Sequence, residues 1–264
     1  AVLVSIPMLV APGRPVGQGV LRYLIFMTLG MPFILLGGWA LNAIEISPAN
    51  EALLLEAMLL LGLGLAFWLA IFPFYTWVPL LTGESQPYIA GFLFSLLPTV
   101  VFFLMLNFLD AFAFLRNSPV FFQGLQLAGT IMVATAGIWA AFQRDLTRLF
   151  GYAVIQETGF ALLAISLRSE TGLEMFAAGL IPRLIGFGLF ALSLSVMQSR
   201  NVSLRFEDEA SAFQQTPIAS VASLVAVFSI SGLPLLAGFP VRQPLLEELG
   251  AGSIVVAIWA LIGS

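Results

Sequence analysis

The sequence predicts an all-α fold, a polytopic transmembrane helical bundle of about eight or nine segments. The 264 residues are 60% hydrophobic and 9% charged, with a mean hydropathy of +1.03, a composition that water-soluble globular domains do not have. The spacing of the charges is the second observation. It leaves uncharged runs, each longer than the ~20 residues that span a hydrocarbon core, at 23–44, 57–83, 85–109, 117–143 and 210–241.

Two more runs of similar length each contain one charge, Glu157 within 149–167 and Arg183 within 175–199. Loops rich in proline, glycine, asparagine and charge separate the runs. We therefore expect helices at 21–44, 52–75, 87–109, 119–143, 147–167, 173–198, 216–239 and 250–264. Together they form one transmembrane domain over 1–264, which we expect to be truncated at both ends because each end lies inside an apolar stretch.

Discontinuous helices are expected near residues 98 and 230–240. Pro98 lies in the middle of an apolar run, and four helix breakers fall close together at Gly232, Pro234, Gly238 and Pro240. Proline frees a backbone carbonyl and kinks a helix, and broken helices at membrane depth line polar cavities or transport sites. Proline is also common in membrane helices, which is the favoured explanation for Pro98 taken alone.

Arginine placement predicts an orientation, because cytoplasmic loops carry an excess of basic residues. If the loops alternate in side, one side carries Arg14, Arg22, Arg144, Arg148, Arg200 and Arg205. The other side carries Arg116, Arg168 and Arg242. The first side is therefore expected to be cytoplasmic, in a bacterial inner membrane or an organellar inner membrane.

The chain contains no lysine, histidine or cysteine. Disulfides, haem ligation by these residues, and zinc or iron–sulfur sites are therefore excluded within it. We expect no cofactor, no metal, no catalytic centre and no nucleic-acid partner. A proton relay would have to use carboxylates, hydroxyls, amides or water, since the imidazole group that titrates near neutral pH is absent.

Glu157 is the main candidate for a functional residue. A carboxylate at bilayer depth costs roughly 2.5–3.5 kcal/mol, so it is paired, protonated or functional. Arg148 lies nine residues earlier, about 13.5 Å along a helix, and cannot pair with it; Arg183 is the expected partner. The candidate ion path consists of Glu157, Gln156, Thr158, Arg183 and Arg242. A fixed buried pair would instead form a barrier to protons, because both groups would stay charged.

Four stretches agree in order and spacing with motifs of one family. They are FPFYTWVP at 72–79, DLTRLFGYAVIQETGFALLAI at 145–165, GLIPRLIGFGLF at 179–190 and SISGLPLLAGFPVRQPLL at 229–246. They resemble, in turn, F-P-F-H-x-W-L-P, D-x-K-R-L-x-A-Y-S-S-I-x-H-x-G, L-F-K-A-L-L-F and L-x-G-x-P-P-x-x-G-F-x-x-K. These motifs occur in the antiporter-like membrane subunits of complex I, the proton-translocating NADH:quinone oxidoreductase, and in related cation/proton antiporters and membrane-bound hydrogenases.

The resemblance implies a mid-membrane chain of lysines, histidines and a glutamate that moves protons, but most of that chain is replaced here. Neutral side chains take the place of its lysines and one histidine, at Trp68, Tyr75, Thr99 and Thr147. A second histidine position holds Glu157, and a family glutamate would fall near Val2. Two cationic positions are kept as Arg183 and Arg242, but arginine does not release its proton.

Three functional hypotheses stay open at this point. In the first, the chain is a membrane-arm subunit of a complex I-type assembly; it either conducts protons through Glu157 or is degenerate and has a mainly structural role. In the second, it is a subunit of a cation/proton antiporter or a membrane-bound hydrogenase. In the third, it is an unrelated carrier or a scaffold of a redox or photosynthetic complex. The resemblance implies other membrane subunits, lipids and a peripheral redox arm as partners.

Overall fold

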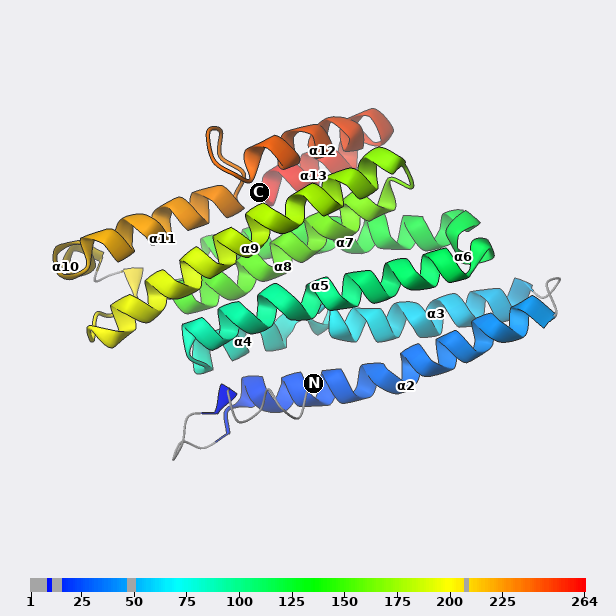
Figure 1. The fold of residues 1–264 in the computed structure, drawn as a ribbon, viewed down its shortest axis with the longest axis horizontal. Helices are drawn as coiled ribbons and strands as arrows, with labels where there is room; N and C mark the ends of the chain where they lie inside the picture. Colours follow the sequence, from blue (N-terminus) through cyan, green and yellow to red (C-terminus); the bar gives the residue numbers. More distant parts are fainter. Residues whose placement is uncertain (1–8, 11–15, 47–50, 207–208) are drawn as a thin grey trace.

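The structure is a computed structural model and describes residues 9–10, 16–46, 51–206 and 209–264. In these ranges the chain is helical and forms no β-strand, and its long helices lie alongside one another (Figure 1). The helices are α2 (Gln18–Ile46), α3 (Glu51–Trp68), α4 (Trp77–Glu84), α5 (Pro87–Ala111), α6 (Ala113–Asn117), α7 (Pro119–Ala141), α8 (Leu146–Ser166), α9 (Glu170–Ser199), α10 (Glu209–Gln215), α11 (Pro217–Ile230), α12 (Phe239–Gly252) and α13 (Ile254–Ile262).

The expected all-α bundle is confirmed. Five of the described helices, α2, α5, α7, α8 and α9, are long and apolar enough to cross a membrane, and α3 and α11 are shorter apolar helices. The expected number of eight or nine segments stays a prediction. Large apolar side chains are exposed along the long helices, for example Trp39 and Ile181, as expected for surfaces that face lipid.

Helix α8 is the centre of the bundle. Within its most apolar stretch 72% of the residues are buried, whereas the other four long helices reach at most 44%. It packs against α4, α7 and α9. Two glycines allow the close approach: a side chain at Gly151 would collide with the backbone of Pro79 in α4, and one at Gly159 would collide with Val133 in α7. Glu157 is therefore held in the most enclosed helix of the described chain.

The expected helix at 52–75 is wrong at its C-terminal end, because α3 ends at Trp68. Ala70 has a φ of 56°, a left-handed conformation that commonly ends helices, and Pro73 has no N–H to continue the ladder. Turns and a short 3₁₀ helix, η1 (Phe74–Thr76), lead directly into α4. The segment 52–75 is therefore discontinuous, although the sequence predicted one continuous helix there.

The discontinuity expected near residue 98 is also wrong. Helix α5 runs unbroken from Pro87 to Ala111 with Pro98 in its interior. A proline removes one backbone hydrogen bond, and long apolar segments on both sides continue the helix past it. Hydroxyl groups beside it bond to the helix backbone, Ser95 to the Gly91 carbonyl at 2.7 Å and Thr99 to the Ser95 carbonyl at 2.8 Å.

The discontinuity expected at 230–240 is confirmed. Helix α11 ends at Ile230 and α12 begins at Phe239, so the expected helix at 216–239 ends early. Most of α12 lies between the helices expected at 216–239 and 250–264. Gly232 has a φ of 76°, which glycine adopts at little cost, and a side chain there would collide with that of Arg242. The break therefore brings the first turn of α12 next to the bundle centre.

Candidate functional site

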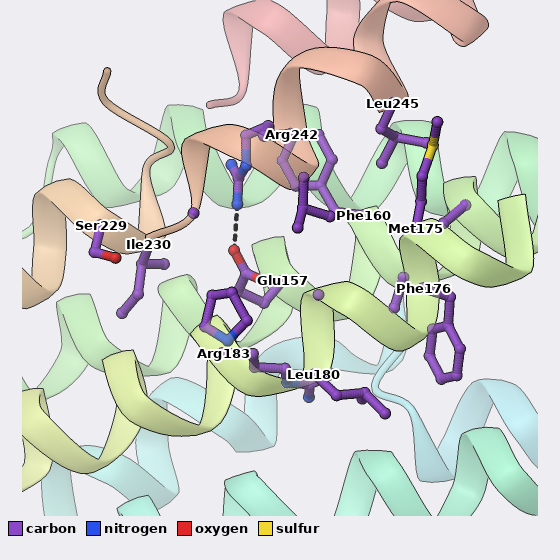
Figure 2. Close-up of a pocket in the computed structure, with 16 residues that line it drawn as sticks. Glu157, Phe160, Met175, Phe176, Leu180, Arg183, Ser229, Ile230, Arg242 and Leu245 are labelled. Atoms are coloured by element: carbon purple, nitrogen blue, oxygen red, sulfur yellow. Dashed lines mark hydrogen bonds and ion pairs between the residues drawn. The ribbon is translucent and has the colours of Figure 1, made fainter. Parts of the chain in front are cut away.

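Glu157 and Arg242 form an ion pair at the break between α11 and α12. Arg242 Nη2 donates a hydrogen bond to Glu157 Oε1 (Figure 2). Both side chains are largely buried, with 8% of Arg242 and 15% of Glu157 exposed. The Arg242 guanidinium also lies over the ring of Phe160, 3.9 Å from its centroid. Phe160 is one turn after Glu157, so α8 offers a carboxylate and an aromatic face to the same arginine.

The expected pairing of Glu157 with Arg183 is therefore wrong. Arg183 is on α9 and only 3% exposed, but its charged group lies near the rings of Phe102 and Phe187, 6.0 and 5.4 Å from their centroids. None of its three guanidinium nitrogens has a hydrogen-bond partner in the described part of the protein. Cation–π contacts of this kind offset part of the lost hydration.

All three charged residues line one cavity. It lies between α8, α9 and the break before α12, and Glu157, Arg183 and Arg242 are the ionisable residues in its wall. Most of the remaining lining is apolar, including Met175, Leu180 and Leu245 (Figure 2). The volume is about 60 Å³, and since one water needs ~10–15 Å³ of such space, the cavity has room for a few waters.

Gln156 and Thr158 flank Glu157 in sequence but not in this cavity. Successive side chains on a helix are rotated by about 100°, so the three residues face different neighbours. Gln156 Nε2 donates to the Ser264 carbonyl at 3.4 Å, while the Thr158 hydroxyl donates to the Val154 carbonyl at 2.8 Å. The structure thus joins Glu157, Arg183 and Arg242 of the candidate ion path and places the other two residues elsewhere.

Three of the four residues at the replaced family positions donate hydrogen bonds to nearby groups. The Trp68 Nε1–H donates to the Met27 carbonyl at 3.0 Å, and Thr99 bonds to its own helix. Thr147 lies at the start of α8, where its N–H donates to Asp145 Oδ1 at 2.8 Å. The Tyr75 ring lies 6.5 Å from that of Tyr152, between centroids. Within the described ranges, no hydrogen bond connects these replaced positions to one another or to Glu157.

Two sequence expectations fall outside the structure, and one residue was missed. Val2 and Arg14 lie outside the described residues. Phe160 was not predicted to take part in the site. Its signal in the sequence is its spacing, since a residue three positions after Glu157 lies on the same face of α8.

Comparison with known proteins places the chain in a family. A family model described as "NADH:quinone oxidoreductase/Mrp antiporter, TM" matches residues 25–264. NADH-quinone oxidoreductase subunit 14 of Thermus thermophilus is 28% identical over 257 residues, 94% of this chain and 57% of the relative. NADH-quinone oxidoreductase subunit N of Deinococcus radiodurans is 25% identical over 254 residues, 94% of this chain and 51% of the relative. The chain spans about half the length of these relatives.

Solved structures share the fold. A chain of respiratory complex I from Thermus thermophilus with bound aureothin superposes with a TM-score of 0.79 at 25% identity, covering 98% of this chain and 60% of that one. A chain of the Mrp complex from Dietzia sp. DQ12-45-1b gives a TM-score of 0.84 at 15% identity, covering 97% and 50%. The five long apolar helices and these matches make the protein an integral, multi-pass membrane protein, and the chain belongs to the NADH:quinone oxidoreductase/Mrp antiporter transmembrane family.

Proposed function

We propose that the chain is the central part of a membrane-arm, antiporter-like subunit of a complex I-type assembly, and that its polar centre is a structural ion pair and not a proton relay. The family match over residues 25–264 and the relatives named subunit N and subunit 14 support the first half. Its partners would then be other membrane subunits, lipids and a peripheral redox arm. The Mrp chain is similar in fold alone, so the names of the relatives favour the complex I assignment.

The observation that supports the second half is the Glu157–Arg242 pair itself. An arginine does not release its proton, and Arg242 occupies Oε1 of Glu157 with a hydrogen bond. The polar groups of Trp68 and Thr99, at two positions where the family resemblance implies lysines, donate to backbone carbonyls. These groups stabilise the bundle locally, and none of them exchanges a proton near neutral pH.

Proton conduction through Glu157 is the second candidate function. The cavity beside Glu157 supports it, because its volume of about 60 Å³ admits a few waters that could carry a proton. The two functions differ in one measurable respect. Conduction requires the carboxylate of Glu157, whereas a structural pair requires only that the cavity contain no additional unbalanced charge.

The test is the double variant Glu157→Gln/Arg242→Gln in the full-length subunit, within its complex reconstituted into sealed vesicles. It removes one negative and one positive charge together, so the net charge of the cavity is unchanged. We expect normal quinone reduction and an unchanged number of protons moved per quinone. A matched control neutralises the exposed pair Asp110 and Arg116, whose charged atoms are 3.9 Å apart. Loss of proton movement with quinone reduction retained in the first variant alone would establish conduction and refute the proposal.

A further inference from the structure

An open groove lies between α12 and α13. The two helices pack against each other, and the groove has a volume of about 400 Å³. Since each water needs ~10–15 Å³ of such space, the groove is large enough for side chains of another segment. Its polar lining includes Gln243 and Glu247 of α12 and Ser231 of the break. The enclosed cavity beside Glu157 is a different space, although Arg242 lies in the wall of both.

Helix α13 forms an apolar ridge along one side of the groove. Ile254, Ile258 and Leu261 share one face of the helix, with 69%, 49% and 64% of their surface exposed. Ile258 and Leu261 also line the groove. A ridge beside a groove is the kind of surface on which a second helix packs. Apolar side chains suit lipid equally well, whereas an ionisable side chain beside them does not.

Glu247 lies at the depth of the hydrocarbon core. Helix α8 has 21 residues with Glu157 near its middle, and Arg242 is bonded to Glu157, so Arg242 marks the centre of the span. From there α12 runs toward the C-terminal end of α8, since Leu245 lines the same cavity as Ala164. Glu247 is five residues after Arg242, about 7.5 Å along the helix. The hydrocarbon core extends about 15 Å from its centre, so this carboxylate lies inside it.

This carboxylate has no cationic partner in the described part of the chain. Gln243 Nε2 donates to Glu247 Oε1 at 3.0 Å, and the adjacent Glu248 is exposed as well. The ion pairs among the described residues involve other acids, Asp110 and Glu157. Carboxylates inside a membrane face protein or water and pair with cations, so lipid tails do not suit this face. A second copy in the same orientation would place the same carboxylate at the same depth across a two-fold axis, which disfavours self-pairing.

We propose that this groove binds a transmembrane helix of a neighbouring subunit that presents a lysine or arginine to Glu247. The helix packs its apolar residues on the ridge of Ile258 and Leu261, and its basic side chain enters the groove beside the carboxylate. Polar side chains that bond across helices hold membrane helices together, and a charge pair fixes the register of such a contact. The inference rests on the proposed function, since it names the chemistry of one contact in that multi-subunit assembly.

The first experiment identifies the occupant of the groove. The 264 residues contain no cysteine, so Ile258→Cys accepts one benzophenone label in the purified complex, once any cysteine elsewhere in the full-length subunit is replaced by serine. After irradiation, mass spectrometry identifies the cross-linked segment. We expect a transmembrane segment of another subunit with a lysine or arginine at the depth of Glu247. Ile181→Cys, on α9 and 65% exposed, is the control and should not cross-link to that segment.

The cross-link leaves the carboxylates unchanged, so it decides the question even if charge variants assemble poorly. Cross-links to lipid alone, to this subunit alone, or to a segment without a basic residue would overturn the inference and leave the proposed assembly intact. A subunit that purifies without any other membrane subunit would overturn the proposed assembly and this inference together.

The second experiment tests the charge. Glu247→Gln/Glu248→Gln keeps the size and polarity of both side chains but removes their charge. Losing one member of a desolvated charge pair mainly speeds dissociation, so we expect the neighbouring subunit to be lost about tenfold faster when the immobilised complex is washed in detergent. Glu170→Gln/Glu174→Gln removes two exposed carboxylates at the start of α9 and should not change that rate. Equal rates in the two double variants would refute the pairing.

Discussion

Neutralising Glu157 should damage the protein more than neutralising its partner Arg242. Glu157→Gln leaves Arg183 and Arg242 both charged in one cavity, a net charge of two, whereas Arg242→Gln leaves Glu157 with Arg183, a net charge of zero. Removing one partner of a buried ion pair costs about 3–5 kcal/mol. We expect Glu157→Gln to reach this range, because both side chains are at least 85% buried, and Arg242→Gln to cost about 1–2 kcal/mol, the value of a lost hydrogen bond.

The assay is the thermal midpoint of the full-length subunit in its complex. At 2–4 °C per kcal/mol for domains of this size, Glu157→Gln should lower the midpoint by about 10 °C and Arg242→Gln by about 2–8 °C. Glu157→Gln/Arg242→Gln restores the original net charge and should therefore lie above the Glu157→Gln single variant, a non-additivity expected of residues in contact. An equal or larger loss for Arg242→Gln than for Glu157→Gln would refute the charge count.

Three further predictions use the same midpoint measurement. Gly129→Val should lower stability by about 1–3 kcal/mol through overpacking, because a Cβ there lies 2.8 Å from the Gly159 carbonyl; Gly124→Val on the same helix, where a Cβ meets nothing within 4 Å, should be neutral, and equal losses would contradict the packing argument. Asp145→Ala removes the N-cap of α8 and should cost about 1 kcal/mol, while Asp145→Asn, which keeps an acceptor, should cost clearly less. Phe160→Leu keeps an apolar side chain but removes the face under Arg242, and should cost about 1–2 kcal/mol more in the wild-type background than in Arg242→Gln; equal costs in both backgrounds would exclude the cation–π contact.

The fold class follows from the lengths of the uncharged runs, because only helices satisfy their own backbone in lipid. Helix breaks follow less directly. The Gly and Pro cluster at 230–240 predicted the end of α11, since several breakers act together. The break after Trp68 was missed because an apolar run continues across it with Pro73 as its one marked breaker. Pro98 shows the reverse error, since a single proline in a long apolar helix is not sufficient to end it.

The site was predictable only in part, because its residues come from elements far apart in the sequence. A carboxylate inside an apolar span is conspicuous in any sequence, so Glu157 was identified directly. Its partner depends on where the break places α12. The sequence favoured Arg183 on the adjacent segment over Arg148, and it gave no reason to consider Arg242, which is 85 positions away. The tertiary arrangement determines which arginine pairs with Glu157, and no local sequence pattern predicts it.

The carboxylate at position 157 and the arginine at position 242 depend on each other. A carboxylate at position 157 is tolerated at this depth because Arg242 bonds to it, and a neutral side chain there would leave the charge of Arg242 buried without a partner. Arginine is also better suited than lysine to position 242, because its planar group bonds to Glu157 through one edge while its face lies on Phe160, which a compact ammonium group cannot do. The same delocalised charge that permits both contacts keeps the proton bound. The contacts that Arg242 makes at the break between α11 and α12 therefore support the proposal that its role is structural.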